Sequence, residues 1–167
     1  MIATQQTALA ETLAIQLNMN LWIAKKNLEG ITNEESLIRA VPTGNHINWL
    51  TGHITAVRCA LLPALRQEPV WGEETLNLYR HGSSGAVDTD YLPFEDVVNA
   101  FYATQQRILD GIASLTEEEL AAPAPFSPGG GQDTLASLLT KSTVHEGYHL
   151  GQTGILRRVI GKEGAIK

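Results

Sequence analysis

The chain has 167 residues, of which 43% are hydrophobic and 18% are charged, and its formal net charge is −6. This length suffices for one domain with its own hydrophobic core, so we expect a single domain over residues 1–167. The acidic charge argues against a nucleic-acid-binding protein, which needs a face rich in Lys and Arg to neutralise phosphates. With one cysteine, Cys59, the chain cannot form an intramolecular disulfide.

The sequence gives no signal for export or for membrane insertion. Residues 1–8 lack a basic segment followed by an uninterrupted apolar run, so we expect no signal peptide. No stretch reaches the ~18 consecutive apolar residues of a membrane span. Together with the single cysteine, these patterns predict a cytoplasmic protein that does not contact membranes.

Apolar residues recur at a spacing of three or four in four long segments, which predicts four long helices. We place these helices at about residues 7–28, 45–65, 93–112 and 134–160. Asn45 and Asp133 are the expected N-terminal caps of the second and fourth helices. Pro63 should end or kink the second helix, because proline lacks a backbone donor and clashes with the preceding turn.

Two short segments between the long helices have the capping-box pattern, in which a Thr is followed three residues later by a Glu. They lie at residues 32–35 and 116–119. Periodicity is absent from residues 67–92, so we expect a long connection there, and connections of that length are often functional. No segment has the alternating period of a strand. The sequence therefore predicts an all-α four-helix bundle with two short connecting helices.

The fourth predicted helix carries the clearest chemical signal. Its inward face turns from apolar to polar at Ser142, His145, His149 and Gln152. Two imidazoles four residues apart lie one turn apart on one face, close enough to bind one metal ion. Such a pair is also compatible with a hydrogen-bonded seam between helices. A third histidine on an apolar stripe, His53 of the second helix, favours the metal site.

Three imidazoles from His53, His145 and His149 would leave a coordination position for water or substrate, as in catalytic zinc sites. Nitrogen ligands also bind Ni²⁺, Cu²⁺, Co²⁺ and Fe²⁺, so the spacing does not identify the metal. For the other two histidines, His46 and His81, we expect capping or solvent-exposed roles. His46 lies two helical turns, about 10 Å, from His53.

Residues 145–149 also match H-E-x-x-H, in which the Glu is the general base of zinc proteases. The glycine and third histidine that metzincins carry downstream are missing here. No predicted strand precedes the motif to hold a peptide substrate. We therefore set the protease interpretation aside and keep Glu146 as a candidate catalytic base beside the metal.

Four short motifs together resemble the DinB/YfiT-like superfamily of metalloenzymes. They are NWLTGHI at residues 48–54, TEEEL at 116–120, HEGYHLGQ at 145–152 and LRR at 156–158. The resemblance implies an up-down-down-up four-helix bundle, commonly a homodimer. It also implies that His53, His145 and His149 bind a divalent metal, with nickel and zinc the typical ions.

Characterised members of this superfamily include transferases and isomerases that use low-molecular-weight thiols such as bacillithiol, mycothiol or glutathione. The resemblance thus implies an enzyme in which a metal ion binds a thiolate and keeps it nucleophilic at neutral pH. Gln152 is the second candidate catalytic residue, and Ser142 is a candidate substrate contact. Arg157 or Arg158 could bind a substrate carboxylate. The alternatives are a metal-dependent hydrolase and a non-catalytic metal-binding or dimerisation module.

Overall fold

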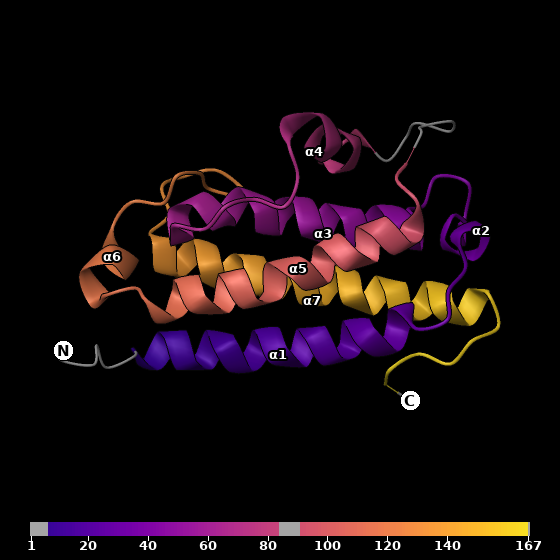
Figure 1. Ribbon diagram of the computed structural model, residues 1–167, viewed down its shortest axis with the longest axis horizontal. Coiled ribbons are helices and arrows are strands. Elements are labelled where there is room, and N and C mark those ends of the chain that lie inside the picture. The colour runs from indigo at the N-terminus through magenta and orange to yellow at the C-terminus, as the bar shows by residue number, and fades with distance from the viewer. Residues whose placement is uncertain (1–6, 84–90, 167) are drawn as a thin grey trace.

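The computed structural model describes residues 7–83 and 91–166 (Figure 1). Within these ranges the regular structure is helical, apart from two isolated β-bridges. The long helices are α1 (Ala8–Leu28), α3 (Ile47–Leu61), α5 (Phe94–Ala113) and α7 (Leu135–Val159). The predicted all-α four-helix bundle is confirmed.

The four long helices pack in a square. α7 lies beside α1 and α3, and α5 lies beside the same two helices. Figure 1 shows α1 and α7 running in one direction and α3 and α5 in the other. This is the up-down-down-up order that the motif resemblance implied, and it sets α3 against α7.

Four short helices join the long ones. α2 (Asn33–Ser36) and α6 (Glu117–Ala121) each begin with the predicted capping box. The other two, η1 (Leu62–Leu65) and α4 (Glu73–Tyr79), were not predicted. The expectation of a connection without regular structure over residues 67–92 is therefore wrong for α4, which at seven residues is too short to show helical periodicity. Residues 84–90 of that connection lie outside the described residues.

The predicted helix starts are off by one residue in two cases. α3 is capped by His46 rather than Asn45, and α7 is capped by Thr134 rather than Asp133. Each observed cap accepts a hydrogen bond from a backbone N–H group three residues on, at 3.0 Å and 3.2 Å respectively. Pro63 acts as predicted, because α3 ends at Leu61 and the chain continues as the 3₁₀ turn η1.

Two apolar clusters fill opposite ends of the bundle. The first joins the N-terminal half of α1 and the start of α7 to the C-terminal ends of α3 and α5, with Leu62 and Leu138 fully buried. The second joins the other halves of the same helices, around Ile47 and Val97. Between them lies a belt of buried polar residues contributed by α3, α5 and α7. The candidate site lies in this belt.

α7 is buried on two faces, which the single predicted stripe did not anticipate. The predicted inward residue His149 is buried, as is Leu138 nearer the start of the helix, whereas Val159 at the end of the helix is 50% exposed. A second buried face includes Thr143 and Leu150, whose carbonyl groups accept hydrogen bonds from asparagine side chains of α1. The second face exists because α7 packs against α1 as well as α3.

Candidate metal centre

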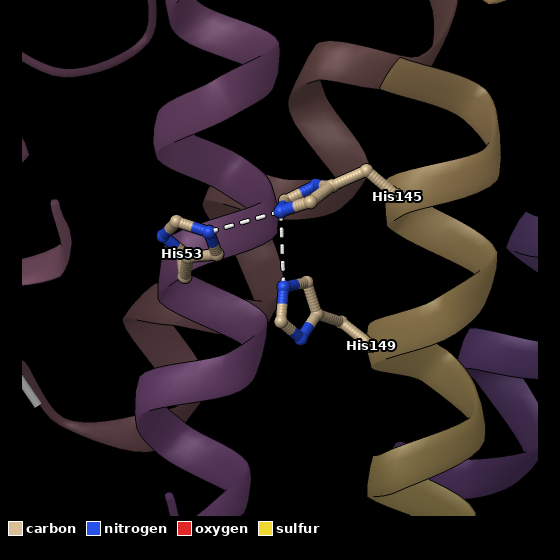
Figure 2. Close-up of side chains that lie close together, drawn as sticks. All are labelled: His53, His145 and His149. Atoms are coloured by element: carbon tan, nitrogen blue, oxygen red, sulfur yellow. Dashed lines mark hydrogen bonds between the residues drawn. The ribbon is translucent and has the colours of Figure 1, made fainter. Parts of the chain in front are cut away.

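Three histidine rings meet between α3 and α7 (Figure 2). Nε2 of His145 lies 3.2 Å from Nε2 of His53 and 3.0 Å from Nε2 of His149. The possible ligand atoms of all three residues lie within 4.8 Å of one another. The structure thus brings together the three histidines that the sequence singled out, with one from α3 and two from successive turns of α7.

The outer nitrogens of two of these rings are fixed by oxygen atoms. Nδ1 of His53 lies 2.8 Å from the backbone carbonyl oxygen of Tyr79, the last residue of α4. Nδ1 of His149 lies 2.7 Å from Oε1 of Gln152, one turn further along α7. Because these oxygens can only accept, both rings carry their hydrogen on Nδ1 and present a lone pair at Nε2. Both lone pairs face Nε2 of His145.

Hydrogen bonds among the three rings leave one of these facing lone pairs unmatched. Nε2 of His145 can carry at most one hydrogen, and that hydrogen can serve only one of the two facing lone pairs. A divalent ion would accept all three nitrogens at once. Zn–N bonds of 2.0–2.1 Å in tetrahedral geometry place ligand nitrogens about 3.3 Å apart, close to the distances between these rings. The three residues therefore fit a metal ion held by imidazole nitrogens.

The protonation of the rings also suits metal binding. Burial, and the proximity of His149 and His53, lower the pKa of His145 to about 4. Burial likewise lowers the pKa of His53 and of His149, although the Tyr79 carbonyl and Gln152 partly oppose it. All three rings are consequently neutral at pH 7, as nitrogen ligands must be.

A pocket of ≈ 470 Å³ opens beside the histidines. Its polar lining comes from two of the three histidines and from His81, Lys141 and Ser142. The rest of the lining is from Val57 of α3 and from residues of the α6–α7 connection. The lining residues are His53, Val57, His81, Phe126, Pro128, Gly129, Lys141, Ser142 and His145. A small molecule in this pocket would therefore contact the side chains of His53 and His145.

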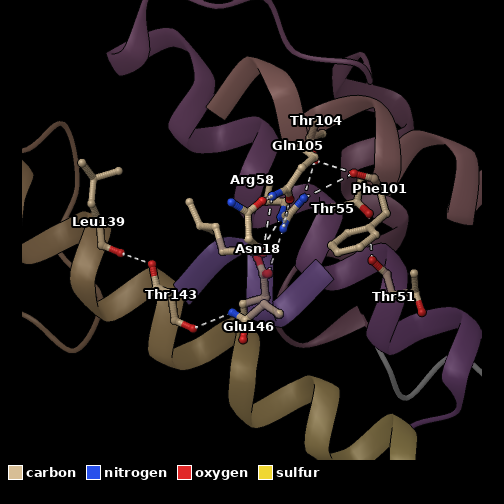
Figure 3. A network of polar contacts seen from close by, with 12 residues as sticks. Asn18, Thr51, Thr55, Arg58, Phe101, Thr104, Gln105, Leu139, Thr143 and Glu146 are labelled. Carbon is tan, nitrogen blue, oxygen red and sulfur yellow. Dashed lines mark hydrogen bonds and ion pairs between the residues drawn. The ribbon is translucent and has the colours of Figure 1, made fainter. Parts of the chain in front are cut away.

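Glu146 points toward Arg58 in the polar belt (Figure 3). Its two carboxylate oxygens accept hydrogen bonds from Nε and Nη2 of Arg58, at 2.7 Å and 2.8 Å. The two side chains are 5% and 2% exposed, and Glu146 does not line the pocket. A carboxylate paired in this way is not free to take a proton at the metal. This placement argues against the base role expected for Glu146 and makes it a structural residue.

The remaining predicted site residues have different positions. Gln152 contacts the ring of His149 and does not line the pocket. Arg157 donates to backbone carbonyl groups at the C-terminal end of α1, and Arg158 donates to the carbonyl group of Ile166. Neither arginine lines the pocket beside the histidines, so this structure does not support the expected contact with a bound carboxylate.

Three neighbours of the site were missed in the sequence or assigned a lesser role. Arg58 could have been recognised in the sequence, because it is a charged residue within a helix that is otherwise buried on nearly all sides. Tyr79 left no signal, since it contributes a backbone carbonyl group that any residue would carry. Trp49 of α3 is the third, and its ring stacks on His53 with centroids 4.7 Å apart and planes at 6°.

The fold and the site together define a helical bundle whose three-histidine cluster fits a divalent metal. A family model described as the DinB superfamily matches residues 23–153, a range that includes all three histidines. The chain therefore belongs to the DinB superfamily, which confirms the resemblance seen in the motifs. A comparison with curated proteins found no match. Among the described residues, the helices are too short or too polar to cross a membrane.

Proposed function

We propose that this protein is a metal-dependent enzyme that transfers a low-molecular-weight thiol to a small electrophilic substrate. The supporting observation is that the three-histidine cluster borders a pocket large enough for a small molecule. Three protein ligands leave at least one coordination position open, as in catalytic rather than structural zinc sites. With Ni²⁺ or Zn²⁺ bound, the ion would ionise a coordinated thiol.

The residues around the pocket favour a thiol over water as the nucleophile. Of the described residues that line it, none is Asp or Glu, and the nearby Glu146 is paired with Arg58. The described residues therefore place no free carboxylate there to take a proton from attacking water. A free thiol has a pKa of about 8.5 and is closer to ionisation at neutral pH than free water, so coordination to the ion would ionise it without such a base.

The chain's own residues would have three tasks in this reaction. The imidazoles hold the ion, and the Tyr79 carbonyl and Gln152 keep two of them turned toward it. The apolar wall formed by Val57, Phe126 and Pro128 would bind the electrophile and exclude water from it. Lys141 and Ser142 would contact polar groups of either substrate.

The test compares metal-loaded protein with metal-free protein on a chromogenic electrophile, with and without glutathione, bacillithiol, mycothiol or cysteine. A nitrophenyl ester serves as the hydrolysis substrate, and His149→Ala is the control for the site. The proposal predicts consumption of the electrophile only when metal and thiol are both present, at a rate at least tenfold lower in His149→Ala. Metal-dependent ester cleavage without thiol would instead indicate a hydrolase. No metal-dependent rate on either substrate would indicate a non-catalytic module.

We further propose that the enzyme is a homodimer. Large apolar side chains are exposed on α1 and α7, and Ile15, Val144 and Tyr148 are each more than 60% exposed. Exposed apolar residues on neighbouring helices are typical of protein interfaces. Sedimentation analysis should give the mass of two chains for the natural sequence and of one chain for Ile15→Lys/Val144→Lys. A single-chain mass for the natural sequence would contradict the proposal.

A further inference from the structure

We propose that Gly52 and Tyr79 position the ligand His53: Gly52 leaves the space that the Tyr79 ring fills, and the seated ring fixes the Tyr79 carbonyl group against Nδ1 of His53. α4 would thus serve as a support for the metal centre. The inference rests on the metal site of the proposed function and is independent of the thiol chemistry.

Gly52 and Tyr79 are in contact too close for any other residue at position 52. A Cβ atom added to Gly52 would lie 2.1 Å from Cδ1 and 2.3 Å from Cε1 of Tyr79. Real Cβ contacts are never that short, so a larger residue would push the ring away. A glycine inside a helix costs about 1 kcal/mol relative to alanine. Here the glycine opens a notch in α3, directly before His53, and the aromatic ring occupies it.

The ring of Tyr79 is held on several sides once it occupies the notch. It is fully buried, and the indole of Trp71 stacks on it with centroids 5.2 Å apart. Its hydroxyl donates to Oδ1 of Asn48 at 3.1 Å and accepts from the backbone N–H of Leu92, also at 3.1 Å. Burial raises the pKa of Tyr79 well above its ordinary value, so the hydroxyl stays protonated and can donate. The position of the residue is therefore fixed by its side chain.

The backbone of Tyr79 transmits that position to the metal ligand. Its carbonyl oxygen lies 2.8 Å from Nδ1 of His53, and the opposite hydrogen-free nitrogen faces the other two rings. Moving the ring out of the notch would move this carbonyl group and release the His53 ring. Loss of such an outer partner typically weakens metal binding 10–100-fold. His149 has its own partner in Gln152 of the same helix, so its orientation does not depend on α4.

The test is the Zn²⁺ affinity of the full chain by chelator competition, together with the visible spectrum of the Co²⁺-loaded protein. Gly52→Ala should bind Zn²⁺ 10–100-fold more weakly and shift the Co²⁺ bands, which report ligand geometry rather than stability. Gly151→Ala is the matched control, because a Cβ at this α7 glycine meets nothing within 4 Å. Gly151→Ala should leave both readouts unchanged.

Tyr79→Phe provides a second test in case Gly52→Ala fails to fold. This change keeps the ring and removes the two hydrogen bonds of the hydroxyl. Because the ring itself stays in place, we expect only about fivefold weaker Zn²⁺ binding. Natural affinity and spectrum in both variants, or in Tyr79→Phe alone if Gly52→Ala is insoluble, would overturn the inference. If the natural sequence itself bound no metal, the metal site of the proposed function would be contradicted. That result differs from unchanged metal binding in the variants, which would contradict only the role of Gly52 and Tyr79.

Discussion

Two polar clusters lie back to back across α7, beginning at adjacent residues. Glu146 enters a cluster with Arg58 in which the charged groups are matched within the chain. His145 enters a cluster of three imidazoles whose facing nitrogens cannot satisfy one another. The comparison teaches that buried polarity alone does not mark a functional site. A cluster with balanced donors and acceptors holds the fold, whereas a cluster with more acceptors than donors leaves a lone pair available to an external cation.

The balance in the Arg58 cluster is nearly complete (Figure 3). Besides Glu146, the guanidinium donates to Oγ1 of Thr104 and Oε1 of Gln105, each at 3.0 Å. Its carbon lies 4.1 Å from the centroid of the Phe101 ring, a cation–π contact. These partners come from α5 and α7, so Arg58 ties α3 to both neighbours. The histidine cluster joins only α3 and α7.

The largest effect is expected from a substitution that breaks the balanced cluster of Arg58 and Glu146. Arg58→Met should destabilise the protein by about 3–5 kcal/mol, because it leaves the Glu146 carboxylate buried without a counter-charge. Arg58→Met/Glu146→Leu removes both charges and should recover most of that loss. Urea unfolding of the metal-free proteins measures both. If the free energy of unfolding of Arg58→Met were within 1 kcal/mol of that of the natural sequence, the Arg58–Glu146 pair would not be holding the bundle together.

A smaller effect should appear in the histidine cluster when one outer partner is removed. Gln152→Ala should lower Zn²⁺ affinity 10–100-fold, about 1.4–2.7 kcal/mol, because Nδ1 of His149 loses its acceptor. Gln152→Glu keeps an acceptor oxygen and is the matched control. Urea unfolding of the metal-free protein should be nearly unchanged in both, since Gln152 is only partly buried. Equal affinities in the alanine variant and the natural protein would contradict the orienting role.

His46 extends the comparison, because it is a buried histidine whose acceptor nitrogen receives a hydrogen bond from the chain itself. Its Nδ1 accepts from the backbone N–H of Trp49 and caps α3, and the ring meets Tyr91 edge-on. Burial, assisted by the charge of Arg39, lowers its pKa to about 4. Because the folded pKa lies below the unfolded value of about 6.5, the unfolded chain binds more protons between these values.

The stability contributed by His46 is therefore fully present above about pH 6.5 and is lost as the pH falls toward 4. We expect the loss to be about 3 kcal/mol, because each unit of pKa difference corresponds to ~1.4 kcal/mol. His46→Asn, which caps without titrating, should lose less stability over the same pH range. Metal-free protein is used for both, so that the other histidines contribute equally and cancel in the difference. Parallel pH profiles would contradict the role assigned to His46.

Periodicity in the sequence predicted the four long helices and the three clustered histidines, because both depend on which residues share a helix face. It could not predict the partner of Glu146, since nothing local pairs residues 58 and 146 before the bundle forms. The H-E-x-x-H match led us to place Glu146 beside the metal. This placement was not reliable, because the motif specifies a spacing and not the direction in which the Glu side chain points. α4 was missed because seven residues are too few for a periodic signal, although α4 supplies the carbonyl that orients His53.

The central claim is that the three imidazoles need a divalent cation. The direct measurement is elemental analysis of the chelator-stripped protein after reconstitution with Zn²⁺ or Ni²⁺ and removal of free metal. The account predicts about one ion per chain in the natural protein and in Arg58→Met/Glu146→Leu, and none in His149→Ala. Metal retained equally in His149→Ala, or no metal in the natural protein after reconstitution, would contradict it.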